Sequence, residues 1–256
     1  MTGAAKRLGR EIALEFARQG WDVAVHYGRS EADAYETVAQ IQGLGRQAQA
    51  FAADLANEAA IAALFNDVTK QFQDLHCLVN SASIFEYDRA NSASPLTQKS
   101  LQEHMQVNLT APILLSQLLF EYQKTKTEKS AGDSLPSVIQ LLDQKLINLN
   151  PDYLSYTLSK AALSTSVEML ALDFAPILRV VGLAPGISLP SGDQTNDGFA
   201  KAHQMTPLGK SSTPLDVAKA AVYLAGANAI TGTTLYVDGG QHLLPSTRDV
   251  MFKTNS

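Results

Sequence analysis

Two residues one helical turn apart carry the strongest chemical signal in this 256-residue sequence. Tyr156 and Lys160 stand at positions i and i+4 of a helical pattern, so a helix places both side chains on one face. An ammonium beside a phenol can lower the phenol pKa, and such a phenol can act as general acid toward a group that receives a hydride. Asp143 ends an apolar run thirteen residues before Tyr156, where its carboxyl can share a proton with the phenol. These residues predict an acid-assisted reduction.

A glycine-containing turn near the start of the chain predicts a phosphate-binding site. Gly3 and Gly9 flank Lys6 and Arg7 at the beginning of a helical pattern. The N-terminus of a helix offers unpaired N–H groups and a partial positive charge, and glycines let a diphosphate approach the backbone. An ordinary helix start explains the same short pattern.

The next apolar run ends in residues that distinguish the two nicotinamide cofactors. In a doubly wound sheet this strand end meets the adenosine ribose, where an acid selects NAD and a base accepts a 2′-phosphate. Here Tyr27 is followed by Arg29 and Ser30, with no acid before Glu31. Arg29 can bind phosphate through two N–H groups and Ser30 through its hydroxyl, although a solvated surface charge also explains Arg29. The pattern favours NADP(H).

Alternating patterns along the chain predict the elements that position these residues. Helical periodicity covers 8–18, 31–44, 57–72, 101–122, 153–174 and 214–227, and short apolar runs cover 21–27, 47–53, 75–79, 137–142, 178–183 and 234–237. Strands separated by helices predict an α/β fold, a Rossmann-type doubly wound parallel sheet flanked by helices. Asp54 and Leu55 follow one strand run, where a carboxylate can accept from an adenine amino group; a helix start alone also explains Asp54.

The composition excludes several classes of function. With 256 residues, 45% of them hydrophobic, the chain can bury a full globular core, and we expect residues 1–256 to form one domain, which the Arg29 pattern makes NADP(H)-binding. A net charge of −5 without a basic stripe argues against nucleic-acid binding. No apolar run approaches the roughly 18 residues of a membrane span, and the first residues lack a signal core, so we expect a cytoplasmic protein without a membrane partner. The histidines and Cys77 lack ligand spacing, so no metal site is predicted.

In combination, these motifs resemble the short-chain dehydrogenase/reductase family over essentially the whole chain. The resemblance rests on the turn at 2–9, Asp54, Asn80-Ser81-Ala82, Asn108, the segment 156–160, Pro185-Gly186 and Asp238-Gly239-Gly240. It implies Tyr156 as proton donor, Lys160 on the ribose and the phenol, and Asn108 on a proton-relay water. It also implies a homotetramer and a mobile substrate loop at about 185–210. The expected cofactor contacts are Gly3, Arg7, Leu8, Gly9, Tyr27, Arg29, Ser30, Asp54, Leu55, Asn80, Ala82, Ser83, Tyr156, Lys160, Pro185, Gly186 and Ser188.

Two departures from the family pattern indicate a narrower branch. Asp143 stands where the family usually has a serine, and Arg7 stands in a turn that commonly follows a glycine-based pattern. With Phe85 after the turn at 80–83, they look like the pteridine reductase and dihydromonapterin reductase branch, in which this aromatic stacks on the pterin opposite the nicotinamide. Core packing is an alternative for Phe85. The expected substrate contacts are Ser83, Phe85, Asp143, Tyr153 and Tyr156.

The resemblance predicts an NADPH-dependent reductase that transfers hydride to a C=N bond of a small pterin-like substrate, with the proton delivered by Tyr156 and Asp143. The nearest alternative is a carbonyl or 3-oxoacyl-thioester reductase on the same fold, and Asp143 counts against it. A further alternative, from another class, is a non-catalytic NADP(H)-binding scaffold or sensor.

The position of the first turn predicts one more feature. In this fold the residues before the turn form a central strand, and here only Met1 precedes Thr2. We therefore expect that this sequence lacks its first strand and that the natural chain begins about six to ten residues earlier, because strands typically have 5–6 residues.

Overall fold

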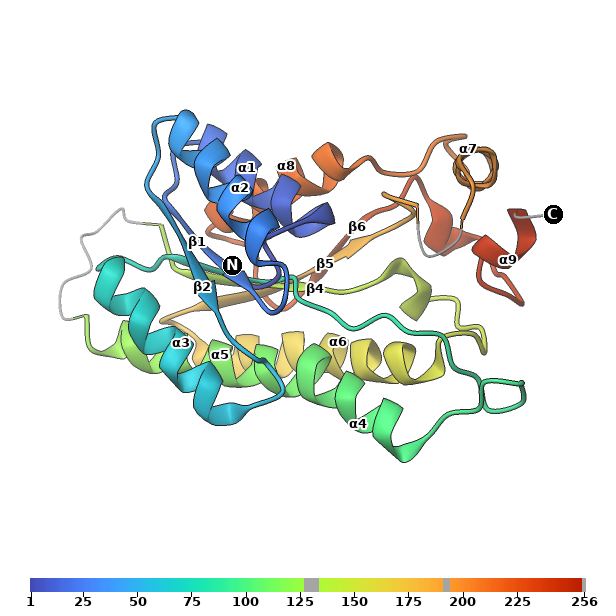
Figure 1. The fold of residues 1–256 in the computed structure, drawn as a ribbon, viewed down its shortest axis with the longest axis horizontal. Coiled ribbons are helices and arrows are strands. Elements are labelled where there is room, and N and C mark those ends of the chain that lie inside the picture. Colours follow the sequence, from blue (N-terminus) through green and yellow to red (C-terminus); the bar gives the residue numbers. More distant parts are fainter. Residues whose placement is uncertain (127–133, 191–193, 255–256) are drawn as a thin grey trace.

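The computed structural model of this protein describes residues 1–126, 134–190 and 194–254. Within these ranges the strands form a parallel sheet between two layers of helices (Figure 1), which confirms the predicted α/β Rossmann-type class. The strands are β1 (Val23–Tyr27), β2 (Ala48–Ala52), β3 (Cys77–Asn80), β4 (Ser137–Leu141), β5 (Arg179–Pro185) and β6 (Thr234–Val237).

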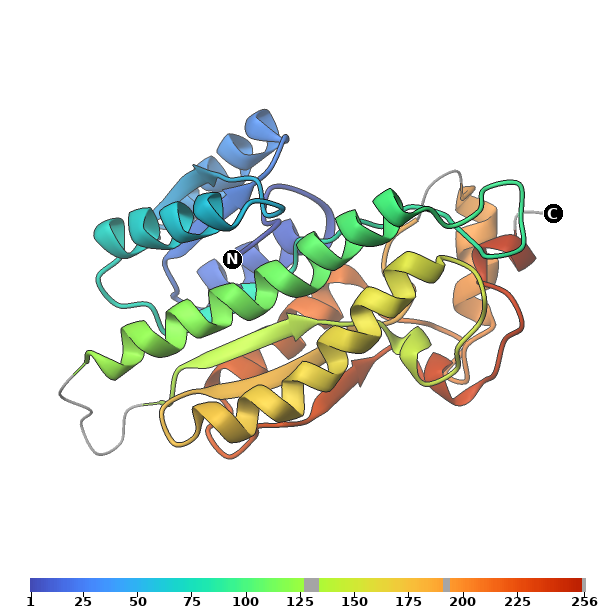
Figure 2. The ribbon, with the colours of Figure 1, turned by 90° about the horizontal axis from the view of Figure 1, so that it is seen from below.

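Each face of the sheet has its own set of helices. One face carries α1 (Arg7–Arg18), α2 (Glu31–Gly43) and α8 (Pro214–Gly226). The other carries α3 (Glu58–Gln71), α4 (Gln98–Met105), α5 (Ala111–Lys124) and α6 (Leu154–Phe174), and Figure 2 shows α5 and α6 running side by side across it. None of the helices in the described ranges combines the length and apolar character needed to cross a membrane.

The sheet has two parts that meet at the first residues of the chain. β1 pairs with β2, and the other four strands follow in the order β3-β4-β5-β6. Between β1 and β3, the backbone oxygen of Met1 accepts from the His26 N–H at 3.1 Å, and the Thr2 N–H donates to the Val79 oxygen at 3.0 Å. Thr2 also forms an isolated parallel bridge with Asn80. In the described chain, residues 1 and 2 thus link the two parts.

Neighbouring residues of each central strand bury their side chains on opposite faces, because successive side chains of a strand alternate. Val138 packs with the core under α3, α5 and α6, whereas Ile139 packs with the core under α1, α2 and α8. Val180 and Val181 divide in the same way. This double burial explains why the strands appear in the sequence as continuous apolar runs.

The predicted element boundaries differ from the observed ones mostly by a few residues, and the larger differences lie near the site. The expected helix 101–122 begins at Gln98, and a wider π-helical turn, Gln106–Thr110, separates α4 from α5. Short α7 (Asn196–Gln204) and α9 (Met251–Thr254) were not predicted. The α7 helix lies within the expected substrate loop, of which residues 191–193 fall outside the described ranges. Thr195 caps α7 by accepting from the Gly198 N–H, a start signal that sequence reasoning passed over.

Candidate active site

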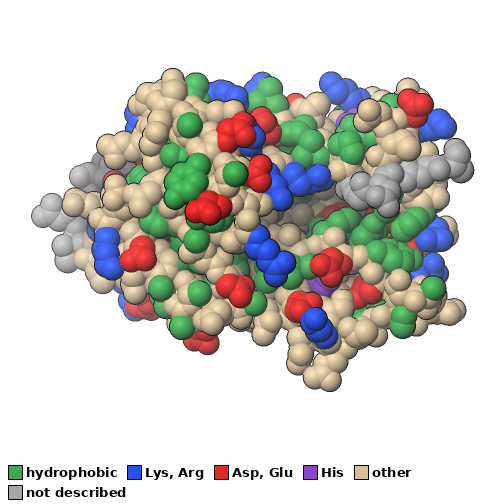
Figure 3. All heavy atoms as spheres, viewed as in Figure 1, with side chains coloured by type: hydrophobic (Ala, Val, Ile, Leu, Met, Phe, Trp, Pro, Cys, Tyr) green, Lys and Arg blue, Asp and Glu red, His purple; other side chains and the backbone are tan. Residues whose placement is uncertain are grey.

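The carboxyl ends of β1 to β5 open into a cavity of about 1220 Å³. Figure 3 shows it as a hollow near the middle of the molecule, with Lys and Arg side chains beside it. Most of the predicted site residues line it: Gly3, Arg7, Leu8, Gly9, Tyr27, Arg29, Ser30, Asp54, Leu55, Ala82, Ser83, Phe85, Asp143, Tyr153, Tyr156, Lys160, Pro185, Gly186 and Ser188. The fold thus gathers strand-end residues from distant parts of the sequence around one space.

Two predicted residues lie behind the cavity wall. Asn80 is buried and donates from Nδ2 to Gln140 Oε1 at 3.1 Å. Asn108, also buried, accepts from the Ile84 N–H at 2.7 Å and donates to the Ile84 oxygen at 2.9 Å. The side-chain amide of Asn80 thus ties β3 to β4, and the expected cofactor contact of this residue stays a prediction. The Asn108 side chain holds the segment after β3, because both of its polar atoms are engaged with the Ile84 backbone.

The turn at one end of the cavity is too tightly packed for a side chain at Gly3 or Gly9. Gly3 has a φ of +61°, and a Cβ on Gly9 would lie 2.0 Å from the Gly3 oxygen. The Gly3 N–H donates to His26 Nδ1 at 3.1 Å, and His26 Nε2 lies 3.1 Å from the Ala53 oxygen. Burial lowers the His26 pKa to about 4, so the ring is neutral and Nε2–H is the donor. Sequence reasoning did not select His26, whose role depends on contacts with two other segments.

Exposed cations line the same end of the cavity. Lys6, Arg7 and Arg29 are exposed, and Arg29 makes no hydrogen bond or ion pair with any residue that the structure describes. Arg7 has a φ of +55° and donates to the Pro190 oxygen at 2.8 Å, so it links the glycine turn to the segment after β5. This end of the cavity is suited to a phosphorylated ligand.

Two predicted cofactor residues also stabilise the backbone that carries them. Asp54 accepts from the Ala56 N–H at 2.9 Å, which shows that it stabilises the turn before α3 while lining the cavity. Ser188 donates to the Gly186 oxygen at 3.1 Å and lies 2.8 Å from the Ser212 hydroxyl. Both positions therefore have a structural reason for their residue type besides ligand binding.

At the other end of the cavity, the phenol and the carboxyl meet directly. The Tyr156 hydroxyl donates to Asp143 Oδ2 at 2.9 Å, and Asp143 Oδ1 accepts from the Lys145 N–H at 2.8 Å. Lys160 Nζ donates to the Leu141 oxygen at 2.7 Å and lies 5.9 Å from the centroid of the Tyr156 ring. The end of β4 and the first turns of α6 thus present a hydrogen-bonded acid pair beside a cation.

Burial shifts the pKa values of Tyr156, Asp143 and Lys160, and the shift of Tyr156 is opposite to the expected one. Burial, and then the neighbouring Asp143 carboxylate, raise the pKa of Tyr156 well above its usual value. The expected net lowering of the phenol pKa is therefore not found, because burial and Asp143 dominate. Burial also raises the pKa of Asp143 and lowers that of Lys160 to about 8. Both members of the acid pair retain protons to higher pH than exposed side chains of the same type.

An aromatic platform borders the acid pair. The Phe85 ring stacks on Tyr153, with centroids 4.1 Å apart and planes at 15°, and meets Tyr156 edge to face at 4.7 Å. Phe85 remains 42% exposed and lines the cavity, which favours a ligand platform over core packing. Tyr153 precedes α6 with a φ of +54°, and Asp88 holds this helix start by accepting from the Ser155 N–H at 2.9 Å.

The C-terminal segment supplies cavity residues that sequence reasoning missed. Asp249, Val250 and Met251 line the cavity with the predicted residues. The Asp249 N–H donates to Asp152, 97 positions earlier in the chain. Because the segment is placed by such long-range contacts, no local motif marks it.

Comparisons with known proteins find relatives that span most of the chain. The profile of the family described as Enoyl-(Acyl carrier protein) reductase matches residues 3–242. The 3beta-hydroxysteroid dehydrogenase 1 of Eggerthella lenta is 32% identical, over 96% of this chain and 93% of that protein. The 3-oxoacyl-[acyl-carrier-protein] reductase FabG of Staphylococcus aureus is 28% identical, over 95% of this chain and 97% of that protein. The crystal structure of FolM Alternative dihydrofolate reductase 1 from Brucella canis, complexed with NADP, superposes with a TM-score of 0.85 at 31% identity, over 97% and 94% of the two chains.

Proposed function

The chain belongs to the short-chain dehydrogenase/reductase family, and from this premise we propose that it is an NADPH-dependent reductase that converts a dihydropterin to a tetrahydropterin. The observation that carries the proposal is the 2.9 Å hydrogen bond between the Tyr156 hydroxyl and Asp143 Oδ2 beside the exposed ring of Phe85. A carboxyl paired with a phenol can deliver a proton to a ring nitrogen, whereas a serine hydroxyl at this position would serve to polarise a carbonyl.

The described residues fit NADPH at the glycine turn. Gly3 and Gly9 keep the turn tightly packed, since a Cβ on either would clash with neighbouring backbone, and glycines in such a turn let a diphosphate approach the backbone. Arg29 extends beside the cavity and is available for a 2′-phosphate. The similar FolM structure from Brucella canis is complexed with NADP, which supports this cofactor.

The residues at the substrate end would divide the work of reduction. Bound NADPH would supply a hydride, and thus two electrons, to the carbon of the C=N bond. Tyr156 would transfer its hydroxyl proton to the nitrogen, and the raised pKa of Asp143 makes this carboxyl a proton source that restores the phenol. Lys160, fixed by the Leu141 oxygen, lies on the ring side of Tyr156, where its charge would stabilise a transient phenolate. Phe85 would hold a flat substrate ring against the acid pair.

A second candidate is reduction of a carbonyl group, as in a 3-oxoacyl thioester. The family profile and the similarity to the FabG reductase of Staphylococcus aureus favour it. Asp143 speaks against it, because in this structure both of its oxygens accept, from the Tyr156 hydroxyl and from the Lys145 N–H, whereas a serine hydroxyl at this position would donate to a carbonyl oxygen.

One assay separates the candidates. NADPH oxidation is followed at 340 nm with dihydrobiopterin, with dihydromonapterin and with an acetoacetyl thioester, using the same enzyme preparation. We expect turnover of at least one dihydropterin with kcat/KM well above that for the thioester. Turnover of the thioester alone would overturn the pterin proposal, and tight NADPH binding without turnover of any of the three would favour a cofactor-binding protein that is not an enzyme.

A further inference from the structure

The C-terminal segment, residues 246–254, reaches into the substrate end of the cavity. Asp249 lines the same space as Asp143 and Tyr156. The α9 helix follows, and Phe252 packs against Tyr87 and Tyr153 at centroid distances of 5.3 and 6.3 Å. The segment therefore rests on the aromatic group that supports Phe85, and its position is coupled to that of the platform.

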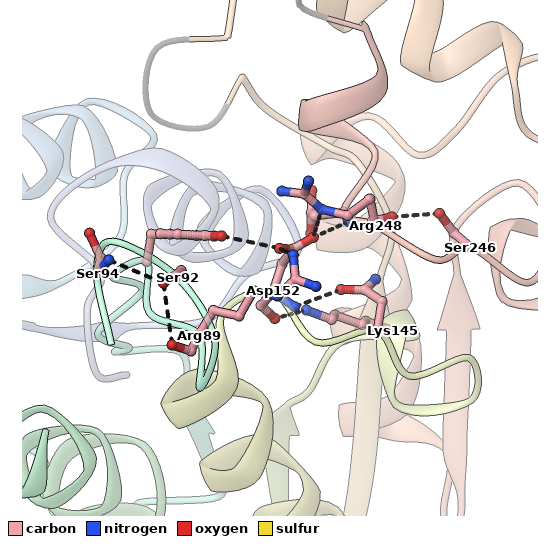
Figure 4. A network of polar contacts seen from close by, with 10 residues as sticks. Arg89, Ser92, Ser94, Lys145, Asp152, Ser246 and Arg248 are labelled. Atoms are coloured by element: carbon pink, nitrogen blue, oxygen red, sulfur yellow. Dashed lines mark hydrogen bonds and ion pairs between the residues drawn. The ribbon is translucent and has the colours of Figure 1, made fainter. Parts of the chain in front are cut away.

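A buried carboxylate holds this segment in place. Asp152 is fully buried, and its Oδ2 accepts from Arg248 Nε at 2.8 Å and from the Asp249 N–H at 2.9 Å. Figure 4 shows Arg248, from the C-terminal segment, directed at the Asp152 carboxylate, and Lys145, from the turn after β4, donating to the Asp152 backbone oxygen. Tyr87 donates to Asp152 Oδ1 at 3.2 Å. We call Asp152, Arg248 and the Asp249 N–H the C-terminal latch. It fixes the backbone of Asp249, and the Met251 N–H holds one oxygen of the Asp249 side chain.

One carboxylate oxygen of Asp249, Oδ2, is available to a ligand. Its Oδ1 accepts from the Met251 N–H at 3.1 Å and so begins α9, whereas Oδ2 makes no hydrogen bond with the described residues. Burial raises the pKa of Asp249, which lies close enough to Asp143 and Tyr156 to raise their pKa values as well. Asp249 is half-buried and lines the cavity, so a donor on a bound substrate can reach Oδ2 and replace the water that an unpaired carboxylate oxygen otherwise binds.

We propose that Asp249 is a substrate-binding residue whose Oδ2 accepts N–H bonds from an exocyclic amino group of a planar nitrogen heterocycle lying against Phe85. In this assignment Asp152 and Arg248 are positioning residues. The inference rests on the proposed function and narrows it to substrates with N–H donors on the ring edge. Acyl thioesters, steroids and sugars offer hydroxyl or carbonyl groups at that edge, and a site built for an N–H donor rejects a substrate that leaves its acceptor unpaired.

The first test neutralises the carboxylate and keeps its shape. Asp249→Asn retains a side-chain oxygen for the Met251 N–H but loses the charge on the acceptor that faces the cavity. We expect the KM for dihydrobiopterin to rise roughly tenfold or more, because hydrogen bonds to charged groups are about twice as strong as neutral ones, with NADPH binding unchanged. The matched control is Asp67→Asn, the same change at an exposed position of α3, where we expect no effect on KM.

A substrate change makes the assignment specific. The 2-desamino analogue of the dihydropterin lacks the proposed donor, so wild type should show a KM for it about as high as Asp249→Asn shows for the parent compound. The variant should discriminate little between the two. The assignment would be overturned if removing the amino group raised KM equally in wild type and in Asp249→Asn, or if Asp249→Asn had the same KM for dihydrobiopterin as Asp67→Asn. A wild-type enzyme inactive with every dihydropterin would overturn the proposed function itself, which is a different result.

The latch has its own test. Arg248→Ala removes the side-chain donor to Asp152, and Arg248→Lys restores a cation at that place. We expect the alanine variant to raise the KM for dihydrobiopterin several-fold at nearly constant kcat, and the lysine variant to recover part of it. A lower Tm for Arg248→Ala without any change in KM would show that the contact is structural only and would remove the positioning role.

Discussion

The two ends of the cavity are built in different ways. At the cofactor end, the fit depends on backbone: Gly3 and Gly9 leave no space for a Cβ, and their turn is held against His26. At the substrate end, the fit depends on side chains, which come from the segment after β3, the end of β4, the start of α6 and the C-terminus. The first end is specified by two short windows of sequence, whereas the second exists only once distant segments have packed.

The largest expected effect is a loss of kcat from a change at the substrate end, with NADPH binding at the cofactor end unchanged. Tyr156→Phe removes the hydroxyl that donates to Asp143. If Tyr156 is the general acid, kcat should fall roughly 10²- to 10⁴-fold, while the Kd for NADPH, measured by fluorescence titration, should stay within about twofold. Tyr35→Phe, on the exposed face of α2, is the control and should leave kcat unchanged. A kcat of Tyr156→Phe within threefold of wild type would show that the proton comes from elsewhere.

The next effect tests whether Asp143 supplies the proton. Because burial raises its pKa, the protonated carboxyl persists above the usual carboxyl range and is lost as pH rises through the raised pKa. The kcat for reduction should therefore fall with rising pH. Asp143→Asn should lower kcat about tenfold to hundredfold, less than Tyr156→Phe, since solvent can still restore the phenol.

The shape of the pH profile is the sharper readout for Asp143. Asparagine does not titrate, so Asp143→Asn should lose the descending limb that wild type shows. Stopped-flow rates of hydride transfer between pH 5 and 9 measure this directly. An unchanged descending limb in the variant would assign it to another group and would remove Asp143 from the proton path.

A smaller effect is expected from a change at the cofactor end, which should raise the KM for NADPH and leave kcat unchanged. Arg29→Ala should raise the KM for NADPH about tenfold and leave that for NADH nearly unchanged, because the lost contact is a charge-assisted bond to the 2′-phosphate. The kcat at saturating NADPH should not change. Arg18→Ala, which removes the ion pair with Glu15 on α1, is the surface control. Equal changes in KM for the two cofactors would contradict the assignment of Arg29.

The contrast between the two ends also explains how much of the fold and of the site can be predicted from the sequence alone. Apolar periodicity predicted the parallel sheet and most helix boundaries, because burial on one or two faces dictates the pattern. Most predicted site residues line the cavity since strand ends converge in this fold. Asn80 shows the limit of this reasoning, because a polar residue at a strand end can also pair with a neighbouring strand, as its side chain does with Gln140.

The residues that sequence reasoning missed share a physical cause. His26 and Asp249 owe their roles to contacts with segments far along the chain, and neither belongs to a short motif. The wrong direction expected for the Tyr156 pKa has the same origin. Helical spacing placed Lys160 on the correct face of the helix, but the burial of Tyr156 and the 2.9 Å approach of Asp143, which raise the pKa, are tertiary properties. Local spacing identifies which groups meet, whereas packing decides which of them dominates.

The smallest expected effect tests the backbone nature of the cofactor end. In Gly9→Ala, the new Cβ would lie 2.0 Å from the Gly3 oxygen, so the turn must move. Overpacking of this kind costs about 1–3 kcal/mol, and in a chain of this size Tm should fall by roughly 2–4 °C per kcal/mol. The KM for NADPH should rise several-fold with kcat retained. Gly43→Ala, in the last turn of α2, is the matched control, because its Cβ meets nothing within 4 Å, and it should hold or slightly raise Tm. If calorimetry gave both variants the same Tm and KM, the turn would be adjustable, and the cofactor end would depend on side chains as the substrate end does.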